Sequence, residues 1–140
     1  NVVRALSAAD GPDGRPLVRA AHDLSNGGLV QSLVDSALRF GIGGVFDVAG
    51  AARRDCVGDH EMLLSESQAR AFVAVPEAAV KAVFAAAEAE GVDAVRIGTT
   101  GGDMLAISGV DLLAAEGEGC GWIASIDELR ELSDTGRKYF

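Results

Sequence analysis

The 140-residue sequence is short of cysteine and has no long apolar run. Its two cysteines, Cys56 and Cys120, do not have the spacing of metal ligands, so they indicate no metal site. A disulfide between them stays open, although free thiols in a cytosolic protein are the more common state of such a pair. No segment is long and apolar enough for a membrane span, and no signal peptide is recognisable. Because the first residue is Asn1 rather than Met, we expect a piece of a longer polypeptide. The expected compartment is the cytoplasm.

Histidine is also scarce, and acidic residues outnumber basic ones. His22 and His60 are the only histidines, and no pairing of a nucleophile with a base stands out. The 12 basic and 21 acidic residues give a formal net charge of −9, which argues against a nucleic-acid or anionic-membrane surface. A nucleotide site is not excluded, because backbone amides and a metal ion can bind phosphate. The G-x-G-x-x-G motif is missing, so we expect no dinucleotide-binding fold.

The 49% of hydrophobic residues are enough for the core of one domain. We expect residues 1–16 to be a lead-in loop or the end of a preceding segment. Residues 17–140 should form a single α+β domain, in which 116–140 is a tail that ends in a helix. The patterns predict strands over 17–23, 43–48, 70–75, 92–99, 104–108 and 110–114, and helices over 27–40, 60–64, 77–90 and from 126 onward.

Three details of this prediction are specific. Residues 49–60 read as irregular, and Thr100–Asp103 reads as a hairpin connection. The strand over 70–75 is almost continuously apolar, which indicates burial on both faces, and the strand over 43–48 should bury Val45 and Phe46. Ser125 followed by Glu128 has the spacing of a capping box at the start of the last helix. Because strands and helices mix without strict alternation, we predict a mixed β-sheet with packed helices.

One stretch carries most of the chemical information: H-D-L-S-N-G-G-L at residues 22–29. It lies between a predicted strand and a predicted helix. A helix N-terminus has free N–H groups that suit anions, and a carboxylate such as Asp23 beside a phosphate site is a natural Mg²⁺ ligand. Helix capping uses the same residue types and is the more common reason for them, but Asp23 precedes the cap and is not needed for capping.

A second stretch, L-L-S-E-S-Q-A-R at residues 63–70, places a carboxylate at the end of an apolar segment. Glu66 therefore has two readings. It is either an ordinary surface acid near a turn or a group that binds a ligand hydroxyl or amine.

These stretches, with V-R-I-G-T at residues 95–99, resemble the carboxy-terminal domain of the phosphoribosylformylglycinamidine synthase large subunit family. The family patterns are H-D-x-S-[DE]-G-G-L, L-F-S-E-S-x-x-R and x-R-I-G-x-V, and the resemblance covers residues 17–115. The sequence differs at Asn26, where the family usually has Asp or Glu, so one carboxylate that could bind a metal is lost.

The resemblance implies an ATP-dependent ligase with Mg²⁺ as its metal. It would convert formylglycinamide ribotide and ammonia from glutamine to formylglycinamidine ribotide in purine biosynthesis. It assigns Asp23 as a Mg²⁺ ligand, Ser25 as a nucleotide contact, and Gly27 and Gly28 as backbone that approaches the nucleotide closely. It suggests Glu66, Ser67 and Gln68 as substrate contacts.

The resemblance also implies an incomplete site in this chain. The family's domain packs against a barrel-forming domain of the same polypeptide, and a glutaminase and a small accessory part, each a subunit or a domain, complete the assembly. We therefore expect residues 1–140 alone to be inactive. Two alternatives stay open. One is another ATP enzyme of the superfamily, such as aminoimidazole ribotide synthetase, selenophosphate synthetase, thiamine-phosphate kinase or a hydrogenase-maturation protein. The other is a non-catalytic scaffold domain.

Overall fold

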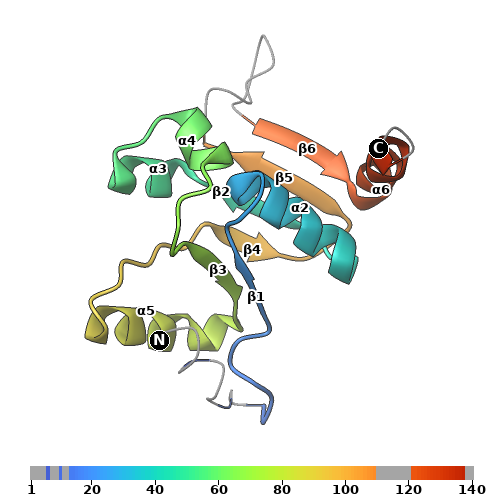
Figure 1. Ribbon diagram of the computed structural model, residues 1–140. Helices are drawn as coiled ribbons and strands as arrows, with labels where there is room; N and C mark the ends of the chain where they lie inside the picture. Colours follow the sequence, from blue (N-terminus) through green and yellow to red (C-terminus); the bar gives the residue numbers. More distant parts are fainter. Residues whose placement is uncertain (1–5, 7–9, 11–12, 110–120, 138–140) are drawn as a thin grey trace. The chain divides into compact units, whose positions relative to one another are not determined.

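The computed structural model describes residues 6, 10, 13–109 and 121–137 (Figure 1). Its contacts group the chain into two compact units. Unit 1 comprises Asn1–Asp23 and Ala69–Arg96, and unit 2 comprises Leu24–Gln68 and Ile97–Phe140. The predicted division into a lead-in over residues 1–16 and one domain over 17–140, with a tail from 116, stays a prediction.

Unit 1 contains a two-stranded antiparallel sheet and a helix. Strand β1 (Ala20–Asp23) pairs with β3 (Ala71–Ala74), and a 3-10 turn, η1 (Glu77–Ala79), leads into helix α5 (Val80–Ala89). Leu6, Leu17 and Ala79 are the buried centre of its apolar cluster. After α5 the chain returns along unit 1, where the Arg96 guanidinium donates two hydrogen bonds of 2.8 Å to the Glu77 carboxylate.

Unit 2 is built around a mixed four-stranded sheet of order β4-β2-β5-β6. Its strands are β2 (Gly44–Asp47), β4 (Gly98–Thr100), β5 (Met104–Ser108) and β6 (Gly121–Ser125). β2 and β5 are parallel, with Val45 beside Ala106, and the two outer pairs are antiparallel. Alternate residues face the core, where Leu105 and Ile107 are 1% exposed, whereas Val45 and Ile123 are more than 60% exposed.

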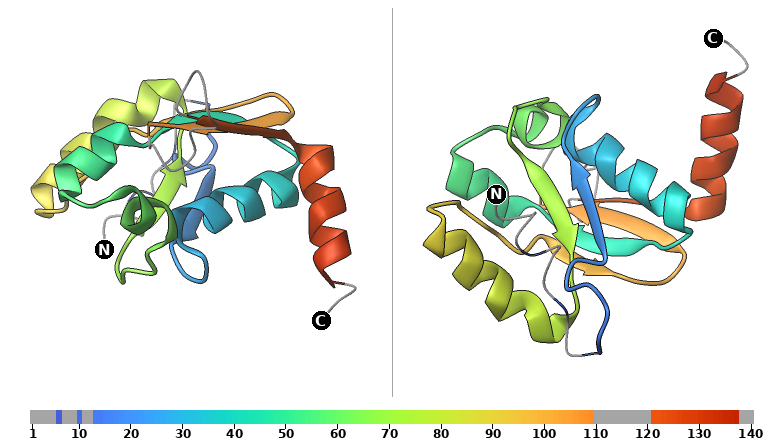
Figure 2. Two further views of the ribbon diagram at one scale, coloured as in Figure 1. Left: turned by 90° about the horizontal axis from the view of Figure 1, so that it is seen from above. Right: turned by 60° about the horizontal axis from the view of Figure 1, so that its bottom comes forward.

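The helices of unit 2 cover one face and one end of this sheet. They are α2 (Gly28–Phe40), α3 (Ala49–Asp55), α4 (Asp59–Leu64) and α6 (Ile126–Arg137). Figure 2 shows α2 and α6 on the same side of the sheet, and α2 contacts both α4 and α6. The apolar stripe of α2 is buried at Leu29, Leu33 and Ala37. The helix ends at Gly41, whose left-handed backbone lets its N–H donate to the Ala37 carbonyl.

The mixed α+β architecture is confirmed, and so is the order of most elements. The predicted helix over 27–40 is α2, the helix over 77–90 is η1 followed by α5, and the short helix before Ser65 is α4. The capping box is also confirmed. The Ser125 hydroxyl accepts a bond from the Glu128 N–H, and the Glu128 carboxylate accepts bonds from the Ser125 N–H and hydroxyl.

The prediction that residues 49–60 are irregular is wrong, because α3 and the start of α4 lie there. The Asp47 carboxylate accepts a 2.9 Å bond from the Ala49 N–H at the start of α3, and Ala51 is buried. Alanine has the highest helix propensity, and burial of Ala51 adds a tertiary contact that the local pattern did not reveal.

The predicted strand over 92–99 is reduced to Gly98–Thr100. The unit boundary explains this, because Arg96 is held by Glu77 in unit 1 whereas β4 pairs with β2 in unit 2. The hairpin prediction for Thr100–Asp103 is also wrong. Strand β2 lies between β4 and β5, so the turn joins strands that are not hydrogen-bonded to each other.

Other corrections concern burial and the tail. β3 is not buried on both faces, since Ala71 is exposed and β3 is only half-buried after it. Val45 is exposed, although Phe46 is buried as predicted. Strand β6 was not predicted, because the glycines around it interrupt the apolar pattern. The predicted strand over 110–114 lies outside the described residues.

Two further predictions concern the membrane and the cysteines. None of the helices built from the described residues is both long and apolar enough for a bilayer span. Cys56 is an exposed free thiol at the end of α3, and Cys120 lies outside the described residues.

The capping box of α6 predicts a loss of stability in acid. The Ser125 N–H and hydroxyl bonds hold the pKa of the Glu128 carboxyl below its ordinary value of 4.5. A carboxyl with a lower pKa in the folded state stabilises the fold above its unfolded pKa, and this contribution is lost as the pH falls through the folded pKa. We expect Glu128→Gln to remove this part of the decline below about pH 4.5, as measured by denaturant titration across pH.

Glu131→Gln is the matched control, because Glu131 lies on α6 outside the capping box. Its pH profile should follow that of the unchanged protein. Identical profiles for Glu128→Gln and the unchanged protein would contradict the prediction.

Candidate functional site

The predicted nucleotide-binding residues of unit 2 lie in the loop before α2, at Ser25 and Gly27, and at the first residue of the helix, Gly28. Leu24 is buried and anchors the loop, whereas Ser25 and Asn26 are exposed. The turn closes when the Gly28 N–H donates a 3.0 Å hydrogen bond to the Ser25 carbonyl. Gly27 takes a left-handed backbone with φ of +77°, which is strained for residues with a side chain. Glycine at position 27 is therefore required by the turn itself.

Glu66 reaches this loop from the second motif. Its Oε1 accepts a 2.9 Å hydrogen bond from the Gly27 N–H, although the two residues are 39 positions apart. A carboxylate at a helix N-terminus is favoured by the helix dipole and satisfies a donor that has no partner within the helix. The structure thus brings together two of the predicted site residues, Gly27 and Glu66, from separate stretches of the sequence.

Gly28 is the point where α2 meets α4. It is buried, and an added Cβ would lie 2.6 Å from the Leu64 carbonyl carbon and 2.7 Å from the Leu63 oxygen. The neighbouring turn is tied down as well, because the buried Ser32 hydroxyl donates 2.8 Å to the Gly28 carbonyl. The close approach that Gly28 permits is therefore an approach of helix to helix. Its predicted approach to a nucleotide stays a prediction.

The rest of the second motif forms an exposed turn after α4. The Ser65 N–H continues the hydrogen bonding of α4 by donating to the Glu61 carbonyl, and the Ser65 and Ser67 hydroxyls are hydrogen-bonded to each other. Ser67 and Gln68 are exposed. Their hydroxyl and amide groups suit hydrogen bonding to a polar ligand, and their predicted contact with substrate stays a prediction.

Asp23 and His22 belong to unit 1, at the end of β1. The His22 Nδ1 lies 2.6 Å from the Asp23 carbonyl oxygen, and the imidazole stacks on Phe72 with ring centroids 5.8 Å apart. His22 is thus a packed and hydrogen-bonded residue. The Asp23 side chain is 81% exposed, and its carboxylate lies 3.8 Å from the His22 ring.

The side chains that could bind a metal can be compared with the coordination that Mg²⁺ prefers. Within the described ranges, no cluster of three or more His, Cys, Asp or Glu side chains could hold a metal ion. Mg²⁺ commonly binds one or two carboxylates and completes its shell with water and substrate phosphates. A single exposed carboxylate such as that of Asp23 fits a Mg²⁺ ion shared with a nucleotide and does not fit a protein-only metal cage.

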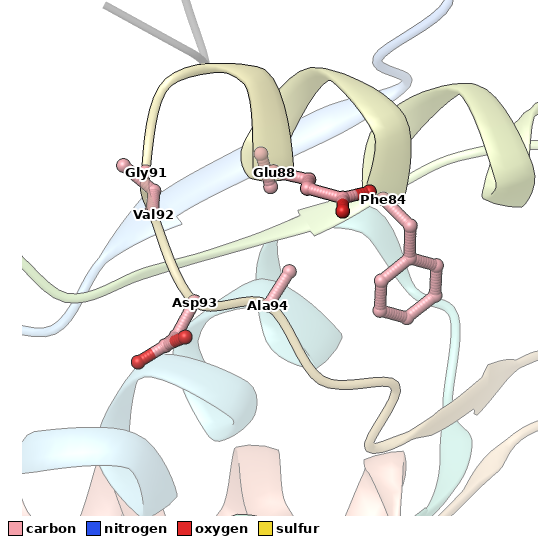
Figure 3. A pocket seen from close by; sticks show the side chains of 7 residues that line it. Phe84, Glu88, Gly91, Val92, Asp93 and Ala94 are labelled. Atoms are coloured by element: carbon pink, nitrogen blue, oxygen red, sulfur yellow. The ribbon is translucent and has the colours of Figure 1, made fainter.

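Unit 1 also has an open depression of about 420 Å³ beside the end of α5 (Figure 3). Phe84 and Glu88 line it from α5, and Asp93 and Ala94 line it from the following segment. Its charged lining residues are both acidic, so this depression does not suit phosphate. None of the site residues predicted from the sequence lines it.

Residues 1–108 match the family model described as AIR synthase related protein, C-terminal domain. This chain belongs to that family. The match extends over the stretch at 22–29, the stretch at 63–70 and most strands of both units. It confirms the resemblance that the sequence motifs indicated.

Individual proteins with similar sequences carry the name of one enzyme subunit. The chain is 40% identical over 125 residues to phosphoribosylformylglycinamidine synthase subunit PurL of Renibacterium salmoninarum, covering 89% of this chain and 15% of that protein. It is 45% identical over 93 residues to the subunit of the same name from Nocardioides sp., covering 66% of this chain and 12% of that protein. This member of the AIR synthase related family therefore spans less than a sixth of the length of these relatives.

A solved structure supports the fold. T. maritima PurL complexed with ATP matches with a TM-score of 0.62 at 16% identity, over 81% of this chain and 19% of that chain. The likeness shows that this AIR synthase related domain shares the α+β fold of the matched part of that protein.

The contact at Gly28 predicts that Gly28→Ala is more damaging than Gly102→Ala. Both glycines have a left-handed backbone, with φ of +66° and +70°. That conformation costs alanine roughly 1–2 kcal/mol. Only at position 28 would the new methyl also meet backbone, because nothing lies within 4 Å of a Cβ at Gly102. We expect a larger loss in the free energy of unfolding for Gly28→Ala in denaturant titrations. Equal losses would contradict the helix packing role.

Proposed function

We propose that this chain is the carboxy-terminal domain of a phosphoribosylformylglycinamidine synthase. The supporting observation is the 40% identity over 89% of the chain to a subunit with that name. In the proposed reaction, ATP phosphorylates the formamide oxygen of formylglycinamide ribotide, and ammonia derived from glutamine displaces the phosphate to give formylglycinamidine ribotide. The intact protein would be an ATP-dependent ligase of purine biosynthesis that acts in the cytoplasm.

The roles proposed for individual residues follow the motifs and their exposure. Asp23 would contribute a carboxylate to Mg²⁺, and the exposed Ser25 hydroxyl would contact the nucleotide. Ser67 and Gln68, also exposed, would contact substrate. A bound Mg²⁺ ion neutralises charge on phosphoryl oxygens during transfer. Asn26 has no charge to offer a metal, so the proposed carboxylate ligand in this motif is Asp23 alone.

The proposed partners complete a site that this chain holds only in part. They are a barrel-forming domain of the same polypeptide, a glutaminase and a small accessory subunit. The chain spans 15% of a relative's length, which leaves most of such a polypeptide to supply the remaining residues. Val45 and Ile123 flank Ala106 in one row across the sheet of unit 2, and both are more than 60% exposed. Exposed apolar side chains of this kind support contact with another protein surface. We propose that the remainder of the polypeptide covers them.

A scaffold role is the second candidate, and two contacts favour it. Gly28 is required for α2 to pack on α4, and Glu66 bonds the α2 N-terminus. Both motifs would then serve the fold alone. The test must therefore separate loss of ligand binding from loss of stability.

The first test is Asp23→Ala in the intact protein, with ATP–Mg²⁺ binding measured by calorimetry. We expect binding to weaken at least about tenfold, or about 1.4 kcal/mol, with an unchanged melting temperature. Asp93→Ala is the matched control, because Asp93 is also an exposed carboxylate of unit 1. A lower melting temperature with unchanged ATP affinity in Asp23→Ala would instead support the scaffold.

The second test concerns the isolated chain. Residues 1–140 should show no ATP-dependent formation of formylglycinamidine ribotide when assayed beside the intact protein, because the proposed site needs groups from the remaining polypeptide. Turnover by the isolated chain would show that its own residues suffice for the reaction.

A further inference from the structure

We infer that Glu66 is a positioning residue for the loop at residues 24–27, and that it does not contact the substrate. This inference deepens the proposed function and rests on it for the identity of the ligand, ATP. The contact that carries it, between the Glu66 carboxylate and the Gly27 N–H, is independent of any ligand.

The loop lacks a cap of its own. Gly27, the residue that precedes α2, has no side chain and receives no side-chain capping bond from its neighbours. Serine, threonine, aspartate or asparagine usually fills this position and satisfies an N–H of the first turn. Here the Glu66 Oε1 accepts the Gly27 N–H at 2.9 Å. In a capping box, Glu or Gln at the third helical position accepts the N–H of the residue that precedes the helix. Val30 has that position in α2, so Glu66 supplies this acceptor from a distant turn.

Helix α4, which precedes Glu66, is anchored by buried side chains. Met62 and Leu63 of α4 are 0% and 1% exposed, and the Ser65 N–H extends the helix by a 3.1 Å bond to the Glu61 carbonyl. Figure 1 shows α4 beside the start of α2, where Gly28 meets the Leu63 and Leu64 backbone. Buried packing thus places Glu66 next to Gly27, so its carboxylate can orient the loop without large movement of its own backbone.

This contact limits how Gly27 could take part in the predicted approach to a nucleotide. An N–H that donates to the Glu66 carboxylate is not available to donate to a phosphate. While Glu66 is in place, Gly27 is not a phosphate donor. The direct nucleotide contact proposed for this loop in unit 2 then falls to the exposed Ser25.

The experiment compares Glu66→Ala with Glu66→Gln in the intact protein. Hydrogen exchange detected by mass spectrometry would follow the peptide over residues 24–31, and calorimetry would measure ATP affinity. In Glu66→Ala the Gly27 N–H loses its acceptor, so we expect exchange about tenfold faster or more in that peptide. We also expect ATP binding weaker by about tenfold, with the Michaelis constant for the ribotide changed by less than about twofold.

Glu66→Gln keeps a side-chain carbonyl at the same position. We expect it to restore most of the exchange protection and of the ATP affinity. A Glu66→Gln variant as defective as Glu66→Ala, or a raised ribotide Michaelis constant with unchanged ATP affinity, would overturn the inference. The first result would show that a side-chain acceptor at this position is not sufficient, and the second would show that Glu66 acts on the ribotide.

Glu61→Ala is the matched control. Glu61 also uses its carboxylate to accept a glycine N–H, that of Gly58 at 3.3 Å, but this contact lies within α4 and its cap. Its removal should speed exchange at the start of α4 and leave the peptide over 24–31 protected. Faster exchange over 24–31 in Glu61→Ala equal to that in Glu66→Ala would overturn the assignment to Glu66.

The exchange and binding measurements separate a failure of the proposed function from a failure of the positioning role of Glu66. If the unchanged protein binds no ATP, the proposed function fails, and the exchange comparison still decides whether Glu66 holds the loop. If ATP binds and exchange over 24–31 is unchanged in Glu66→Ala, the proposed function stands and the positioning role is overturned.

Discussion

The first turn of α2 packs on the end of α4, and the geometry of the candidate site in unit 2 depends on this contact. Gly28 lets the two backbones approach to a distance that excludes a Cβ. The buried side chains of α4, led by Met62 and Leu63, keep the helix in that place. Because tightly packed interiors change shape only at a cost, the turn after α4 and the loop before α2 are held next to each other.

The hydrogen bond between Glu66 and Gly27 follows from that packing and gives the site its electrostatic character. A free helix N-terminus attracts anions, but this one already has a carboxylate. The family resemblance thus assigns Gly27 and Glu66 to ligand contacts, whereas in the structure the two residues bond to each other. In the motif H-D-L-S-N-G-G-L, Gly27 serves the conformation of the turn and Gly28 serves the packing of α2 on α4. The ligand roles of Ser25 and Asp23 stay proposals.

The same motif crosses the division between the two units. Asp23 is the last residue of unit 1, and Leu24 is the first residue of unit 2. A second crossing lies between Gln68 and Ala69. A third follows Arg96, which pairs with Glu77 in unit 1, while the next residue belongs to unit 2. All three crossings fall within motifs that resemble the synthase family. The relatives are much longer than this chain, which spans 15% of the length of one of them.

The sequence by itself determined the elements whose signals are local. Apolar periodicity and glycine predicted α2 and α5, the Ser125–Glu128 spacing predicted the cap of α6, and the ordered motifs identified the family. Only the tertiary structure decided that β2 lies between β4 and β5, that Gly28 touches α4, and that Glu66 bonds Gly27. The physical reason is range: capping and periodicity act within a few residues, whereas these contacts join distant segments whose meeting depends on how the whole core packs.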